Sequence, residues 1–216
     1  WCARSWSTGL GKATLLWGLK STRRAVTGPT SWRRINVEAI CLRELRLRLK
    51  APFETSFGIT QERRVLLIEA QADGVSGWGE ITAGETPHFS GETTDTAWHV
   101  VSDYLAPLLL GRQLAAACEA AGVLAPIRGH PMAKAGIENA LWDIEAQQKG
   151  LPLARLLGGS NSEIPCGVSL GIQKSVAALL EKIEAELAAG YHRIKIKIKP
   201  GWDVEVAAAV RTRFPQ

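Results

Sequence analysis

Sulfur-containing residues are few in this sequence, and they show no regular spacing. Met132 is the single methionine, and the four cysteines form no Cys-x-x-Cys motif: Cys2, Cys41, Cys118 and Cys166. Scattered cysteines argue against a metal cluster or a disulfide framework, so we expect a cytoplasmic protein with unpaired thiols. No apolar run approaches the roughly 18 residues that a membrane span requires, so we expect no membrane association.

Acidic residues are absent from residues 1–34, which we call the leader. The leader contains seven of the 26 lysines and arginines and four of the eight tryptophans, and the rest of the chain holds 19 basic against 21 acidic side chains. The basic balance therefore comes from the leader alone, which argues against a nucleic-acid-binding protein. A protein that binds through this basic leader is a weaker alternative.

The leader shows no clear helical or strand period, whereas regular patterning begins abruptly at Ile35. An organelle transit peptide has a similar Arg-rich, Ser/Thr-rich and acid-free composition. We favour sequence upstream of the true coding region, and we predict that residues 1–34 lie outside the fold.

Residues 35–160 predict an α+β domain. Alternation of apolar and charged residues favours strands, and residues spaced by three and four favour helices. The expected elements are strands over 35–50, 64–72 and 75–81, a loop over 51–58, and helices over 92–110, 131–149 and 152–157. Asp143 and Glu145 on the second of these helices are expected to serve in packing.

Residues 161–216 predict the start of a βα-repeat domain. The expected elements are strands over 164–172 and 192–199, a helix over 174–190, and a helix from Asp203 through Arg213. The order strand, helix, strand, helix predicts a parallel sheet.

Three lysines alternate with isoleucines in the last strand. A period of two places Lys195, Lys197 and Lys199 on one face. An isolated strand could simply present them to water, but a strand in a βαβ unit is normally covered on both faces. Neighbouring charge and desolvation both lower the pKa of a lysine, which suits a base that abstracts a proton beside a carboxylate. Lys199, which precedes Pro200, is expected to lie closer to solvent.

Several motifs in this order resemble the muconate-lactonizing branch of the enolase superfamily, and within it the o-succinylbenzoate synthase and N-acylamino acid racemase subgroup. They are APFETSFG (51–58), GWGE (77–80), TPHFSGETTDTAWHV (86–100), MAKAGIENALWDIEAQQKGLPLARLLGG (132–159) and RIKIKIKPGWD (193–203). The resemblance runs from about Ile35 to Phe214. It implies an α+β capping domain followed by the first βα units of an incomplete TIM-type (β/α) barrel.

The resemblance also implies roles for individual residues. Members bind one Mg²⁺ and abstract the α-proton of a small-molecule carboxylate substrate. Lys197 matches the base and Lys195 its partner. The residues expected to contact substrate are Phe53, Phe57, His88, Phe89 and Ser169. For Ser169, a buried hydroxyl bonded to backbone is an equal alternative, and Phe89 stands where many relatives have tyrosine.

Only two βα units follow residue 163, whereas a barrel of this type has eight. The resemblance puts the metal ligands on later strands, so we expect none in this chain and expect the 216 residues alone to be inactive. For the whole protein we expect a homo-oligomer that dehydrates its substrate to o-succinylbenzoate in menaquinone synthesis. The alternatives are an N-acylamino acid racemase or dipeptide epimerase and, in another class, a truncated non-catalytic product.

Overall fold

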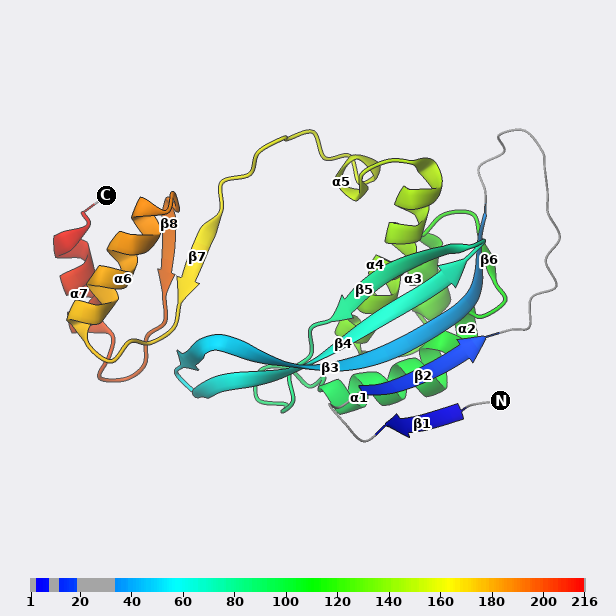
Figure 1. Ribbon diagram of the computed structural model, residues 1–216, viewed down its shortest axis with the longest axis horizontal. Helices are drawn as coiled ribbons and strands as arrows, with labels where there is room; N and C mark the ends of the chain where they lie inside the picture. Colours follow the sequence, from blue (N-terminus) through cyan, green and yellow to red (C-terminus); the bar gives the residue numbers. More distant parts are fainter. Residues whose placement is uncertain (1–2, 8–11, 19–33, 216) are drawn as a thin grey trace. The chain divides into compact units, whose positions relative to one another are not determined.

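The computed structural model describes residues 3–7, 12–18 and 34–215, and the chain divides into two compact units (Figure 1). The first unit comprises Trp1–Leu47 and Arg63–Ser160, and the second comprises Arg48–Glu62 and Asn161–Gln216. The end of one long hairpin, residues 48–62, therefore belongs to the second unit. We call this segment the hairpin tip.

A six-stranded sheet forms the first unit, in the order β1-β2-β3-β4-β5 with β6 paired to the start of β3. Its strands are β1 (Ala3–Ser7), β2 (Lys12–Gly18), β3 (Ile35–Thr55), β4 (Gly58–Ala72), β5 (Val75–Ile81) and β6 (Gln113–Leu114). The predicted strands within β3, β4 and β5 are confirmed. The predicted loop over 51–58 is wrong, because both strands continue to a turn at Ser56-Phe57, where the Thr55 hydroxyl donates to the Gly58 carbonyl at 3.2 Å.

Two strands lie in the leader, where we expected no strand period. β2 pairs antiparallel with Ala39–Arg43 of β3, and β1 pairs antiparallel with β2. An edge strand presents unpaired N–H and C=O groups. A second strand can pair with these backbone groups even when its side chains do not alternate between apolar and polar. The rest of the leader up to residue 33 lies outside the described residues.

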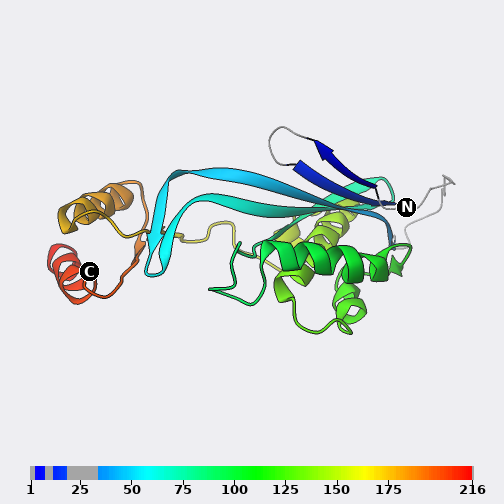
Figure 2. The same cartoon turned by 90° about the horizontal axis from the view of Figure 1, so that it is seen from below.

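Helices cover one face of the β3–β5 sheet (Figure 2). They are α1 (Thr94–Val100), the π-helical turn η1 (Val101–Leu105), α2 (Ala106–Leu109), α3 (Glu119–Leu124), α4 (Pro131–Lys149) and α5 (Leu153–Leu156). Thr93 caps α1: its hydroxyl accepts the Thr96 N–H, and the Thr96 hydroxyl accepts the Thr93 N–H. The π turn ends two residues before Pro107, which lacks a backbone N–H and whose ring clashes with the carbonyl four residues earlier in a regular helix. In the described part of the chain, no helix is long and apolar enough to cross a membrane.

Helix α4 packs directly against β5 through glycines. A Cβ atom on Gly79 would lie 1.9 Å from the carbonyl oxygen of Gly136, so neither backbone could stay in place. At the same contact, Asp143 accepts the Trp78 N–H at 2.9 Å. Glu145 accepts another backbone N–H at 2.7 Å. The packing roles expected for both carboxylates are confirmed.

The second unit contains a parallel pair of strands with two helices. Its elements are β7 (Gly167–Leu170), α6 (Val176–Ala188), β8 (Arg193–Ile196) and α7 (Val204–Arg213). The Ser175 and Asp203 side chains accept backbone N–H groups at the starts of α6 and α7. The parallel register of β7 and β8 confirms the predicted β-α-β-α order.

Deleting residues 1–33 tests whether the strands in the leader support the fold. The buried cluster that runs from Ile35 to Ile144 already joins β3–β5 to the helices. We therefore expect the free energy of unfolding, measured with urea, to change by less than about 1 kcal/mol. A loss above about 2 kcal/mol, the size of a lost core contact, would show that the leader packs as part of the domain.

Candidate functional site

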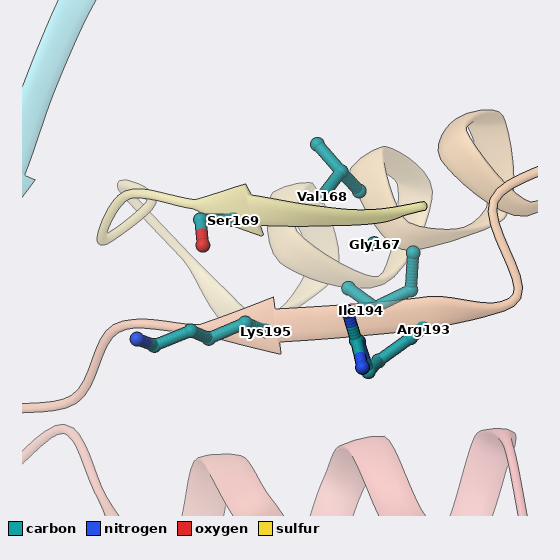
Figure 3. A pocket seen from close by; sticks show the side chains of 6 residues that line it. All are labelled: Gly167, Val168, Ser169, Arg193, Ile194 and Lys195. Carbon is teal, nitrogen blue, oxygen red and sulfur yellow. The ribbon is translucent and has the colours of Figure 1, made fainter. Parts of the chain in front are cut away.

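The two faces of the β7–β8 pair differ in chemistry. Leu170, Ile194 and Ile196 pack against α6 and α7 in one apolar cluster. Strand residues alternate between faces, so Ser169 and Lys195 lie on the other face, directly opposite each other in register (Figure 3). In this view the Lys195 side chain extends toward the carboxyl end of β8.

Small residues alternate along β7 on the polar face. Gly167, Ser169 and Gly171 are spaced by two, and they run beside Arg193 and Lys195 on β8. A hollow of about 490 Å³ follows the two strands, lined by Gly167, Val168, Ser169, Arg193, Ile194 and Lys195. A hydroxyl and two cationic side chains around open space can receive a carboxylate.

Lys197 lies just beyond β8 but continues its pairing with β7. Its backbone N–H donates to the Leu170 carbonyl at 3.0 Å. The side chain of Lys197 is half-buried, whereas that of Lys195 is exposed. Helices α6 and α7 pack against the isoleucine face, and among the described residues the lysine face is open at Lys195. The roles of Lys197 as base and Lys195 as its partner stay predictions.

The hairpin tip reaches the segment that follows β7. The Ile172 N–H donates to the Glu54 carbonyl at 3.0 Å, and the Phe53 ring lies 3.4 Å from where a Cβ on Gly171 would stand. Phe57 occupies the turn and is 70% exposed. The structure thus brings Phe53 to the carboxyl end of β7, the same end at which Lys197 follows β8.

The Lys199 side chain is 41% exposed, and it also has a partner that the sequence does not predict. Its Nζ atom lies 2.6 Å from Oε1 of Glu54 in the hairpin tip. Sequence reasoning missed this partner because 145 positions separate the two residues. No local spacing signals such a pair.

His88 and Phe89 lie in the first unit, on a loop that is closed at its base. Gly84 and Thr93 form a bridge, and the Thr94 N–H donates to the Gly84 carbonyl at 2.8 Å. His88 Nδ1 lies 3.4 Å from the Thr86 hydroxyl, and Phe89 is 84% exposed. The loop therefore presents both predicted residues at its surface.

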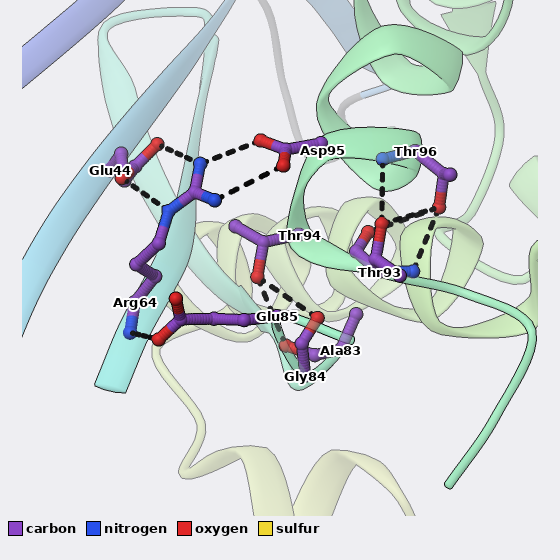
Figure 4. A network of polar contacts seen from close by, with 9 residues as sticks. All are labelled: Glu44, Arg64, Ala83, Gly84, Glu85, Thr93, Thr94, Asp95 and Thr96. Carbon is purple, nitrogen blue, oxygen red and sulfur yellow. Dashed lines mark hydrogen bonds and ion pairs between the residues drawn. The ribbon is translucent and has the colours of Figure 1, made fainter. Parts of the chain in front are cut away.

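Arg64 connects this loop to the sheet (Figure 4). Its guanidinium donates to both Glu44 oxygens at 2.7 and 2.9 Å and to both Asp95 oxygens at 2.7 and 3.2 Å. Its backbone N–H donates to Glu85 at 3.4 Å. Hydrogen bonds that Arg64 donates to Glu44 and Asp95 raise the pKa of Arg64, and the bond to Arg64 lowers the pKa of Asp95. No local pattern in the sequence indicates this network, which joins both ends of the loop.

Metal-ligating side chains do not gather at this site. Within residues 3–7, 12–18 and 34–215, no group of three or more His, Cys, Asp or Glu side chains could hold a metal ion. The described residues therefore do not fit the Mg²⁺ that the resemblance implies.

Comparisons with known proteins relate the chain to one family. Residues 37–158 match the family model for the mandelate racemase / muconate lactonizing enzyme N-terminal domain. An o-succinylbenzoate synthase from Geobacillus kaustophilus is 50% identical over 182 residues, which cover 84% of this chain and 48% of that protein. An N-succinylamino acid racemase from Thermus thermophilus is 44% identical over 182 residues, covering 84% and 49%.

A solved structure gives the same result. A member of the enolase superfamily from Listeria innocua Clip11262 superposes with a TM-score of 0.78 at 34% identity, covering 84% of this chain and 49% of that one. The predicted fold class, a capping domain followed by the first βα units of a barrel, is confirmed. The chain spans about half the length of the curated relatives it matches.

The Arg64–Asp95 pair should make stability depend on acid pH. The pKa of Asp95 is lowered in the fold from its ordinary value of 3.8, so its stabilising effect is present above that value. The effect is lost as the pH falls from 3.8 through the lower folded pKa. Because Asp95 is 72% exposed, we expect Asp95→Asn to reduce the free energy of unfolding by at most about 1 kcal/mol at pH 6. Urea unfolding should show that this gap closes toward pH 2.5.

An Arg64→Met background provides the control for this prediction. There, Asp95→Asn should leave the free energy of unfolding unchanged at either pH, because the two changes remove the same interaction. A gap that persisted at pH 2.5, or in the Arg64→Met background, would contradict the assignment.

Proposed function

The chain belongs to the mandelate racemase / muconate lactonizing enzyme family of the enolase superfamily, and on this premise we propose that the whole protein abstracts the α-proton of a carboxylate substrate. The observation that supports the proposal is the polar face of the second unit. Lys195 and Lys197 lie there at the carboxyl end of β8, beside the glycines and Ser169 of β7.

Lys197 is the proposed base. Its neutral amine takes the α-proton and becomes an ammonium group, while the electron pair of the C–H bond moves into the carboxylate and leaves an enediolate. Lys195, two residues earlier on the same face of the strand, supplies positive charge that stabilises the carboxylate. Ser169 donates a hydrogen bond, and Phe53 with Phe57 provides an apolar boundary. We assign substrate contacts to His88 and Phe89 on the family resemblance alone.

The first candidate reaction is dehydration to o-succinylbenzoate in menaquinone synthesis, favoured by 50% identity to the G. kaustophilus synthase. The second is N-succinylamino acid racemisation, favoured by 44% identity to the T. thermophilus racemase. Both begin with loss of an α-proton, so the lysine pair serves either. Dipeptide epimerisation is a further member of this reaction class. Mg²⁺, the cytoplasm and a homo-oligomer belong to the proposal by resemblance, and no step is assigned to the ion.

A hybrid enzyme tests the reaction class. In it, the 182 matching residues of this chain replace their counterparts in the G. kaustophilus synthase. We expect a folded hybrid to turn over the synthase substrate, an N-succinylamino acid, or both, and we expect the 216-residue chain alone to turn over neither. A hybrid that folds but is inactive on both, beside an active parent enzyme, would favour the non-catalytic alternative.

The role of Lys197 has its own test in the hybrid. Lys197→Ala should reduce turnover by at least about 10²-fold, the low end for a general base, because no amine remains to take the proton. Lys199→Ala should cost far less turnover, and Lys182→Ala, on the surface of α6, should cost none. Full activity in Lys197→Ala would remove Lys197 from the mechanism. If only Lys199→Ala lost turnover, the base would be Lys199, two residues from the proposed position.

A further inference from the structure

The hairpin tip is attached to the β7–β8 sheet at three points. The Ile172 N–H donates to the Glu54 carbonyl at 3.0 Å, and the Glu54 carboxylate pairs with Lys199 at 2.6 Å. At the third point, a Cβ on Gly171 would lie 3.1 Å from the Glu54 nitrogen and 3.4 Å from the Phe53 ring. Glycine at position 171 therefore allows the tip to lie directly on the backbone.

Glu54 contributes two different groups to this attachment. Its backbone carbonyl binds the segment after β7, while its carboxylate binds Lys199 after β8. One residue of the tip thus contacts both of the segments that follow β7 and β8. The Lys199 and Glu54 side chains are 41% and 30% exposed. A pair at this exposure contributes little to global stability, so its effect is expected on the local order of the tip.

Lys199 itself is held in place by its backbone. Its N–H donates to the Trp202 carbonyl at 3.2 Å, and the Trp202 N–H donates to the Lys199 carbonyl at 2.8 Å. Trp202 packs against the apolar cluster beneath the strands. The ammonium group of Lys199 therefore extends from a turn that is hydrogen-bonded and packed on the apolar cluster. The hairpin tip does not belong to that cluster, so Lys199 can hold it in place.

We infer that Lys199 is a positioning residue, which holds the hairpin tip through Glu54 and thereby sets Phe53 beside Gly171 at the carboxyl end of β7. The attachment is independent of any activity. Its consequence for catalysis rests on the proposed function: Phe53 bounds the apolar part of the substrate, so a loosened tip weakens substrate binding more than proton abstraction.

Hydrogen exchange in the 216-residue chain tests the attachment. Lys199→Met keeps the length of the side chain and removes its charge. We expect exchange to become roughly 2- to 5-fold faster over residues 50–60 and at the Ile172 N–H, the range for a partly exposed ion pair. Glu184→Gln, which breaks the Arg213–Glu184 pair of 2.7 Å in the same unit, should leave both unchanged.

Two further variants keep the inference falsifiable. Glu54→Gln is nearly isosteric and should reproduce the faster exchange even if Lys199→Met fails to fold. Exchanging the charges, with Glu54→Lys and Lys199→Glu together, should restore protection. Unchanged exchange in both single variants, or equal loosening in Glu184→Gln, would overturn the inference.

Kinetics of the hybrid enzyme separate this inference from the proposed function. Lys199→Met should raise KM by at least about 5-fold and change kcat by less than about 3-fold, because ground-state and transition-state binding are lost together. A folded hybrid inactive on both substrates would favour the non-catalytic alternative to the proposed function, while hydrogen exchange would still decide the attachment. A loss in kcat alone would refute positioning through Phe53.

Discussion

The arrangement of the candidate site depends on the two-residue period of strands that pack on helices from one side. Once Ile194 and Ile196 bury their side chains against α6 and α7, the lysines between them must lie on the opposite face. The same constraint on β7 leaves Ser169 and two glycines facing them. The packing of the apolar cluster therefore also determines which side chains lie on the polar face.

A second constraint acts in the first unit, where backbone meets backbone. Gly79 and Gly136 allow α4 to approach β5 so closely that a single Cβ atom would force them apart. Asp143 uses this approach to bind the Trp78 N–H. The Asp143 carboxylate thus joins α4 to β5, in the packing role that the sequence predicts, and the close approach is consistent with close-packed interiors.

The sequence predicts those parts of the fold that depend on local rules. Periodicity predicts the strands within β3–β5 and the β-α-β-α order. Helix α4 is indicated by Pro131 at its start and by Gly150 at its end, which adopts a left-handed conformation. Contacts between distant residues carry no such signal. The alternating pattern of the strand does not show which residues Arg64 binds. Nothing near Arg64 in the chain indicates Glu44 and Asp95 as its partners. The pairing of β2 with β3 likewise depends on backbone hydrogen bonds, which the pattern of side chains does not predict.

The three lysines illustrate the same limit within a single strand. Their spacing makes them equivalent, yet tertiary contacts give each a different environment. Lys195 is exposed opposite Ser169, Lys197 is half-buried beside Leu170, and Lys199 is paired with Glu54. The Lys199 ammonium group is held at 2.6 Å by the Glu54 carboxylate, whereas Lys197, two residues earlier, is not part of that pair. The hairpin tip therefore gives Lys199 a contact that the two-residue spacing does not assign to any one of the three lysines.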